Sequence, residues 1–155
     1  MTYEIEIREY DPQQVVTMRV AALPTQFDDK LHSALKDVRI FLEEKGVNLS
    51  EPPLTIYHEV GLIRMVCETG FPVNQIIEPD DKIIVGELPG GRAAVTHHTG
   101  PITFASLKPA HRSVIQWIES NGENQSAPPR EVYLTMPSGP DEDFDCTTEI
   151  IWPLA

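Results

Sequence analysis

The chain has 155 residues, of which 41% are hydrophobic and 23% charged, the ordinary balance of a folded globular protein. Its formal net charge of −12 argues against direct binding to nucleic acid, because phosphates require Lys and Arg. It has no apolar run of about 18 residues that could span a membrane, and its first residues lack the features of a signal peptide. We therefore expect a cytoplasmic protein with no membrane partner.

The cysteines and acidic residues predict no metal site and no cofactor. Cys67 and Cys146 are too few for a disulfide framework and belong to no Cys-x-x-Cys or Cys/His cluster, so two reduced thiols are expected. No phosphate loop, dinucleotide fingerprint or nucleophilic Ser or Cys motif is present. Residues 141–145 (Asp-Glu-Asp-Phe-Asp) are expected to form a solvated acidic loop, because they lack EF-hand spacing.

The first half of the chain predicts two strands, a helix and two further strands. The strands are expected at residues 3–8, 15–21, 54–57 and 62–69. The first two should pair as a hairpin across a turn at residues 11–13. Apolar residues at three- and four-residue steps predict a helix over residues 27–45. Asp28 or Asp29 would cap its start, and Gly46 would be its left-handed terminating residue.

The second half predicts the same order of elements. The strands are expected at residues 83–88, 92–99, 131–135 and 147–151. Residues 89–91 would form a hairpin turn between the first two of these strands. The helix is expected over residues 104–121, with Pro109 in its first turns and Gly122 as its terminator.

An internal repeat relates the two halves. When residues 30–57 are shifted by 76 positions, apolar helix residues, glycines and prolines coincide. The coinciding pairs include Leu31 with Leu107, Gly46 with Gly122, Pro53 with Pro129 and Tyr57 with Tyr133. The closing strands align after five more residues, so that Glu68 falls on Glu149 and Phe71 on Trp152.

The repeat predicts the fold class. We expect a single α+β domain over residues 1–155, with repeats at about 1–73 and 83–155. The duplicated β-β-α-β-β halves would form an antiparallel sheet with approximate two-fold symmetry and a central ligand cleft.

The two copies differ where a ligand would bind. Thr55 of the first copy is replaced by Glu131 in the second. A carboxylate in a short apolar strand is costly to bury unless it has a partner. We therefore expect Glu131 to form the charged floor of a pocket.

The chain resembles the GyrI-like small-molecule-binding domain, which is also the effector-binding domain of AraC-type and MerR-type transcription regulators. The resemblance covers essentially the whole chain and rests on the order of four short segments. These are residues 88–94 (Leu-Pro-Gly-Gly-Arg-Ala-Ala), 98–101 (His-Thr-Gly-Pro), 131–134 (Glu-Val-Tyr-Leu) and 148–154 (Thr-Glu-Ile-Ile-Trp-Pro-Leu).

The resemblance implies a binding site for bulky, often cationic, lipophilic drugs in an aromatic-lined pocket with an acidic floor. The floor glutamate of the family falls on Glu131, and a second family acid matches Glu149. The family often carries Tyr where this chain has Ile151. The candidate walls are Tyr57, Tyr133, Trp117 and Trp152, with core packing as the alternative reading for Trp117 and the tyrosines. His97 and His98 are read as strand residues with no metal role.

The function expected first is a stand-alone small-molecule sensor or sequestering protein linked to transcription regulation. The chain begins directly with its first strand, so no DNA-reading module is expected in it. One alternative is a hydrolase of reactive cyclopropane-type compounds, with Glu131 and Tyr133 in acid–base roles. Another is a protein-interaction inhibitor of the gyrase-inhibitor type. Binding is favoured over catalysis, and the protein partner, if there is one, stays open.

Overall fold

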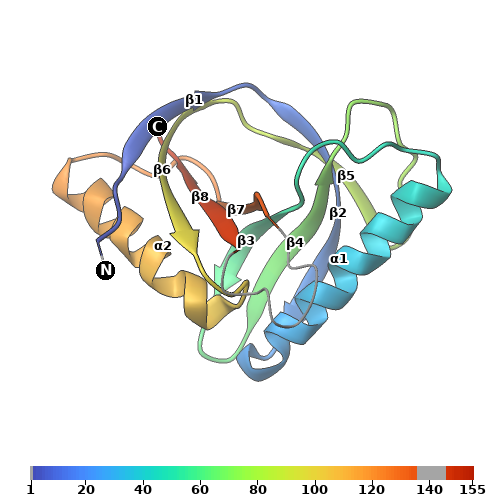
Figure 1. Cartoon of the computed structure of the whole chain (residues 1–155), viewed down its shortest axis with the longest axis horizontal. Helices are drawn as coiled ribbons and strands as arrows, with labels where there is room; N and C mark the ends of the chain where they lie inside the picture. Colours follow the sequence, from blue (N-terminus) through green and yellow to red (C-terminus); the bar gives the residue numbers. More distant parts are fainter. Residues whose placement is uncertain (1, 136–145) are drawn as a thin grey trace. The chain divides into compact units, whose positions relative to one another are not determined.

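The computed structural model describes residues 2–135 and 146–155, so the acidic segment 141–145 lies outside the described residues. Two helices and eight named strands follow one another along the chain (Figure 1). In order they are β1 (Glu6–Tyr10), β2 (Gln13–Ala22), the short 3-10 helix η1 (Pro24–Gln26), α1 (Phe27–Glu44), β3 (Leu54–Val60), β4 (Met65–Pro72), β5 (Ile83–Leu88), β6 (Gly91–Thr99), α2 (Phe104–Ser120), β7 (Arg130–Tyr133) and β8 (Thr147–Pro153). The expected α+β class is confirmed.

The chain forms two compact units. Unit 1 consists of Met1–Asp11 and Pro89–Ala155, and unit 2 of Pro12–Leu88. Each unit contains four antiparallel strands and one long helix. The strand order is β1-β6-β8-β7 in unit 1 and β5-β2-β4-β3 in unit 2. Each unit therefore takes one edge strand from the other half of the sequence.

Unit 2 has its core between α1 and the sheet. The helix packs on β2 and β4, as Figure 1 shows. Its apolar residues recur at helical spacing and are buried, as expected: Phe27, Leu31, Ala34, Leu35, Val38 and Leu42. Gly46 follows the helix at φ 75°, the left-handed conformation that glycine adopts at low cost. The expected helix end is confirmed.

Unit 1 is built in the same manner around α2. The helix packs on β6 and β8, and Leu107, Ala110, Val114 and Ile118 form its buried face. Thr103 caps the helix by accepting a hydrogen bond from the Ser106 N–H at 3.2 Å. Pro109 lies inside the helix, which nevertheless begins at Phe104.

The expected hairpins are wrong. β1 pairs with β6 and not with β2, and β5 pairs with β2 and not with β6. Alternating polarity predicts a strand but carries no information about its partner, because the partner is chosen by packing of distant segments. Pro12 stands in the short connection between β1 and β2, where its missing N–H cannot support a hairpin ladder.

The expected N-cap of the first helix is also wrong. Gln26 occupies the cap position and makes no side-chain cap bond, because the turn η1 leads directly into α1. Asp28 and Asp29 lie in the first helical turn, where their charges complement the positive end of the helix dipole.

Two smaller expectations concern thiols and membranes. Cys67 and Cys146 are both buried, and they belong to different units. Across the described residues, neither helix is long and apolar enough to cross a membrane.

Candidate functional site

Strand β7 distributes its side chains between the two faces of the unit 1 sheet. Glu131 and Tyr133 face α2, since Tyr133 belongs to the core cluster under that helix and Glu131 bonds to a helix side chain. Arg130 and Val132 face the other way, where Val132 packs against Ala93, Val95 and Ile151. The register of β7 with β8 opposes Arg130 to Ile151 and Glu131 to Ile150. Because successive side chains of a strand point to opposite faces, Arg130 and Glu131 lie on different sides of the sheet although they are adjacent in sequence.

The Glu131 carboxylate is completely enclosed, with an exposed fraction of 0%. Its Oε1 accepts a hydrogen bond from the Tyr133 hydroxyl at 2.8 Å. Its Oε2 lies 2.7 Å from Nε2 of His111, a residue of α2. A buried carboxylate is tolerated when donors replace its lost water, and these two groups do so.

Trp152 selects the tautomer of His111. The indole Nε1 of Trp152 donates to Nδ1 of His111 at 3.0 Å. Because an indole N–H can only donate, Nδ1 must carry a lone pair. The imidazole proton then resides on Nε2 and is donated to Glu131. The hydrogen-bond chain Trp152–His111–Glu131 thus directs the Nε2 proton of the histidine to the buried carboxylate.

A second polar group in the same unit surrounds His98 of β6. Its Nδ1 lies 2.7 Å from the Tyr3 hydroxyl and its Nε2 lies 2.9 Å from Oγ of Ser106. Burial lowers the pKa of His98, while the charge of Glu131 acts in the opposite direction. Gly100 leaves room here, because a Cβ on it would lie 3.0 Å from Nε2 of His98.

Glu149 lies on the sheet face opposite to Glu131. Its carboxylate accepts a hydrogen bond from the Tyr10 hydroxyl at 2.7 Å and lies 3.3 Å from Nη1 of Arg8 and 3.2 Å from Nε2 of His97. Burial and the bond to Glu149 raise the pKa of Tyr10. The structure therefore does not bring the two candidate acids together on one face.

The aromatic candidates occupy three different settings. Tyr133 and Trp152 join the chain of hydrogen bonds to Glu131. Trp117 is partly buried against the core cluster under α2, in agreement with the packing alternative. Tyr57 belongs to unit 2, where it is 5% exposed and packs 6.0 Å from the ring of Phe27.

Sequence reasoning missed His111, although the alignment of the two halves of the sequence contains a signal for it. A shift of 76 positions places His111 on Leu35, a core residue of unit 2. The same shift places Glu131 on Thr55, and the shift with five more residues places Trp152 on Phe71; Thr55 and Phe71 are both buried in unit 2. The three aligned positions are therefore apolar or neutral in unit 2 and form a linked polar set in unit 1.

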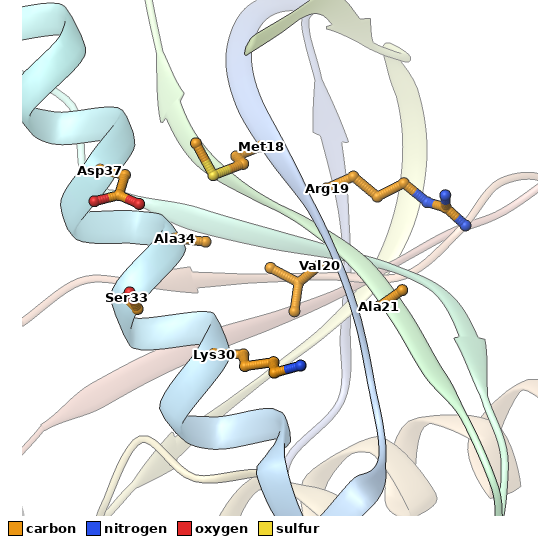
Figure 2. A pocket seen from close by; sticks show the side chains of 8 residues that line it. All are labelled: Met18, Arg19, Val20, Ala21, Lys30, Ser33, Ala34 and Asp37. Atoms are coloured by element: carbon orange, nitrogen blue, oxygen red, sulfur yellow. The ribbon is translucent and has the colours of Figure 1, made fainter. Parts of the chain in front are cut away.

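Unit 2 carries a shallow groove between α1 and β2, with a volume of about 260 Å³. Figure 2 shows Val20 of β2 and Ala34 of α1 facing one another across it, with Lys30 and Asp37 along the helix. None of the expected ligand-binding residues lines this groove. Within residues 2–135 and 146–155, no group of three or more His, Cys, Asp or Glu side chains is arranged to hold a metal ion.

A model of the GyrI-like small-molecule-binding domain matches residues 3–155. The chain belongs to this family. No curated protein matches the chain. This GyrI-like chain is similar in fold to several solved structures, with identities below 25%.

Two of these structures are of EcmrR. Its C-terminal domain is 23% identical at a TM-score of 0.81, with 100% of this chain and 99% of that chain covered. EcmrR in a complex with DNA is 24% identical at a TM-score of 0.83, with 98% of this chain covered. The GyrI-like chain spans 57% of that longer protein.

Two more distant structures share the fold. SAV2435 bound to tetraphenylphosphonium is 14% identical at a TM-score of 0.68, with coverage of 100% of this chain and 94% of that chain. A hydrolase from Listeria innocua is 10% identical at a TM-score of 0.64, with coverage of 98% and 92%.

Proposed function

We propose that this GyrI-like protein binds a lipophilic cation in unit 1, with Glu131 as its charged partner, and serves as an effector sensor or sequestering protein linked to transcription regulation. The observation that carries the proposal is the fully buried Glu131 carboxylate. A cation with aromatic surfaces can balance the charge of such a carboxylate, which is enclosed away from solvent.

The repeat supports a ligand-directed role for Glu131. We propose that residues 1–155 form one domain made of two copies of a β-β-α-β-β unit. Unit 2 folds with Leu35, Thr55 and Phe71 at the positions of His111, Glu131 and Trp152. A buried charge is therefore not a requirement of this architecture, and its presence in one copy only is explained by binding.

The route to Glu131 passes His111 and Trp152. His111 is 13% exposed at its side chain, and Trp152 is also partly buried, whereas Glu131 is enclosed. A ligand would reach the carboxylate by displacing the imidazole, after which Tyr133 and Trp152 would contact its apolar surface. SAV2435, which was solved with tetraphenylphosphonium, suggests the chemical class of the first probe.

The test compares thermal unfolding with tetraphenylphosphonium and with triphenylphosphine oxide, a neutral molecule of similar shape. At 100 times its dissociation constant, a ligand adds roughly 2.7 kcal/mol to the free energy of unfolding. We expect the cation to stabilise the wild type and Glu149→Gln, and to lose this effect in Glu131→Gln. Equal responses in all three proteins, or equal effects of both compounds, would contradict the proposal.

A hydrolytic function is the second candidate, since Glu131, Tyr133 and His111 are joined by hydrogen bonds through which a proton can move. Mass spectrometry of any bound compound after incubation distinguishes the two functions. A binding protein returns the compound unchanged, and a hydrolase returns it with the mass of one water added or as fragments.

A further inference from the structure

Arg130 is a buried cation whose hydrogen-bonding groups are not used. Its exposed fraction is 4%, and its side chain points to the face of the unit 1 sheet away from α2. Among the described residues its side chain stacks on Tyr10, with the guanidinium carbon 5.3 Å from the centre of the ring. No hydrogen bond or ion pair of its guanidinium occurs among residues 2–135 and 146–155.

The neighbouring acid is already engaged. Glu149 receives the hydroxyl of Tyr10 and contacts Arg8 and His97, so it acts on Arg130 only through space. Arg8 also forms an ion pair with Glu6. The stacked face of Arg130 is thus occupied by Tyr10, while the in-plane N–H groups remain available to a ligand.

Burial opposes the charged form of Arg130 and lowers the pKa of its guanidinium, yet an arginine side chain stays protonated in proteins. A largely enclosed cation without an ion pair is unfavourable in the unliganded protein. The fold does not require an arginine at this strand position, because the shift of 76 positions places Arg130 on Leu54, a buried apolar residue of unit 2.

We propose that Arg130 binds the carboxylate of an apolar organic acid on the sheet face of unit 1 opposite to α2. The planar guanidinium offers two parallel N–H groups, the geometry that matches both oxygens of a carboxylate. Val132, Ile151 and the ring of Tyr10 supply apolar surface beside it for the body of the acid.

The charge balance of this face explains why the ligand needs an apolar body. Arg8 and Arg130 are matched in number by Glu6 and Glu149, so the face has no strong excess of positive charge. A small inorganic anion gains little from such a surface, whereas directed hydrogen bonds together with apolar burial favour an organic acid. This site goes beyond the proposed function, because Glu131 lies on the other face of β7.

The experiment measures binding of 4-phenylbutyrate by titration calorimetry, with 4-phenylbutyramide and inorganic phosphate as comparison probes. The wild type is expected to bind the acid at least about tenfold more tightly than the amide, since the amide cannot form the charge-assisted pair. Phosphate should bind more weakly than the acid. An amide that binds as well as the acid, or phosphate that binds more tightly, would overturn the assignment.

Three variants test whether the preference for the acid depends on Arg130 and not on Arg92 or Glu131. Arg130→Leu copies the residue of unit 2 and is expected to lose the preference for the acid, while Arg92→Met, which removes an exposed arginine of the same unit, keeps it. Glu131→Gln should also keep it, so failure here and failure of the proposed function are distinguishable. Circular dichroism confirms folding of each variant. Unchanged binding in folded Arg130→Leu overturns the proposal, and the acid–amide comparison in the wild type decides it if that variant does not fold.

Discussion

Trp152 donates its indole N–H to Nδ1 of His111 at 3.0 Å, and this bond selects the neutral form of the histidine that faces Glu131. The two residues come from β8 and α2 and are 41 positions apart. Their contact fixes the tautomer of the histidine that bonds to the buried carboxylate.

The tautomer of His111 is the first prediction. In the wild type at neutral pH, nitrogen NMR should show a neutral ring with its proton on Nε2, because Nδ1 accepts from Trp152. In Trp152→Phe this restriction disappears, and Nδ1 becomes able to hold a proton. Trp117→Phe is the matched control, since Trp117 has no bond to His111. Protonation of Nδ1 in the wild type would contradict the deduced hydrogen-bond chain.

The pairing of His111 with Glu131 predicts non-additive stability. His111→Leu removes a donor from the enclosed carboxylate and should lower the free energy of unfolding by about 1–3 kcal/mol. The double variant His111→Leu with Glu131→Thr copies Leu35 and Thr55 of unit 2, and it should recover part of that loss. Urea unfolding measures all members of the cycle. Purely additive effects would show that the two side chains do not depend on each other.

The lowered pKa of His98 predicts a dependence of stability on pH. The unfolded state takes up a proton near the ordinary histidine value of about 6.5, whereas the folded state takes it up only at lower pH. Stability due to this residue is therefore complete above that value and falls as the pH decreases toward the lowered pKa. Urea unfolding at a series of pH values should show a smaller decline in His98→Gln than in the wild type. An equal decline in both would assign the effect to other groups.

A close approach of two strands predicts a sensitive glycine in unit 2. A Cβ on Gly70 of β4 would lie 1.9 Å from the carbonyl oxygen of Val16 in β2, so Gly70→Ala forces the strands apart. We expect a loss of more than about 3 kcal/mol in the free energy of unfolding. Gly86→Ala in β5 is the control, since a Cβ there meets no atom within 4 Å. Similar stability of both variants would contradict the geometry.

Much of the local structure was predictable from the residues. The helices over 27–45 and 104–121 follow from apolar spacing, and they were found as Phe27–Glu44 and Phe104–Ser120. Gly46 and Gly122 were recognised as helix ends, and both adopt positive φ. Such features depend on interactions within a few residues, which a sequence displays directly.

Strand partners were not predictable in the same way. The expected hairpins failed because β1 pairs with β6 and β2 with β5, contacts that join segments far apart in the chain. The family resemblance also implied one pocket with both Glu131 and Glu149, while the register of β7 and β8 places them on opposite faces. A polarity pattern predicts that a side chain is buried, but it does not predict which residues pack against that side chain.

The sequence by itself determined the α+β class, the correspondence between residues 30–57 and the segment 76 positions later, and the presence of an unusual acid at residue 131, since each depends on local spacing or residue type. Only the tertiary structure decided that His111 and Trp152 meet that acid, and that the Arg130 guanidinium lies beside Tyr10 without a side-chain hydrogen bond among the described residues. Hydrogen bonds and ion pairs require particular distances between atoms, and only the packed sheet and helix bring distant residues to those distances.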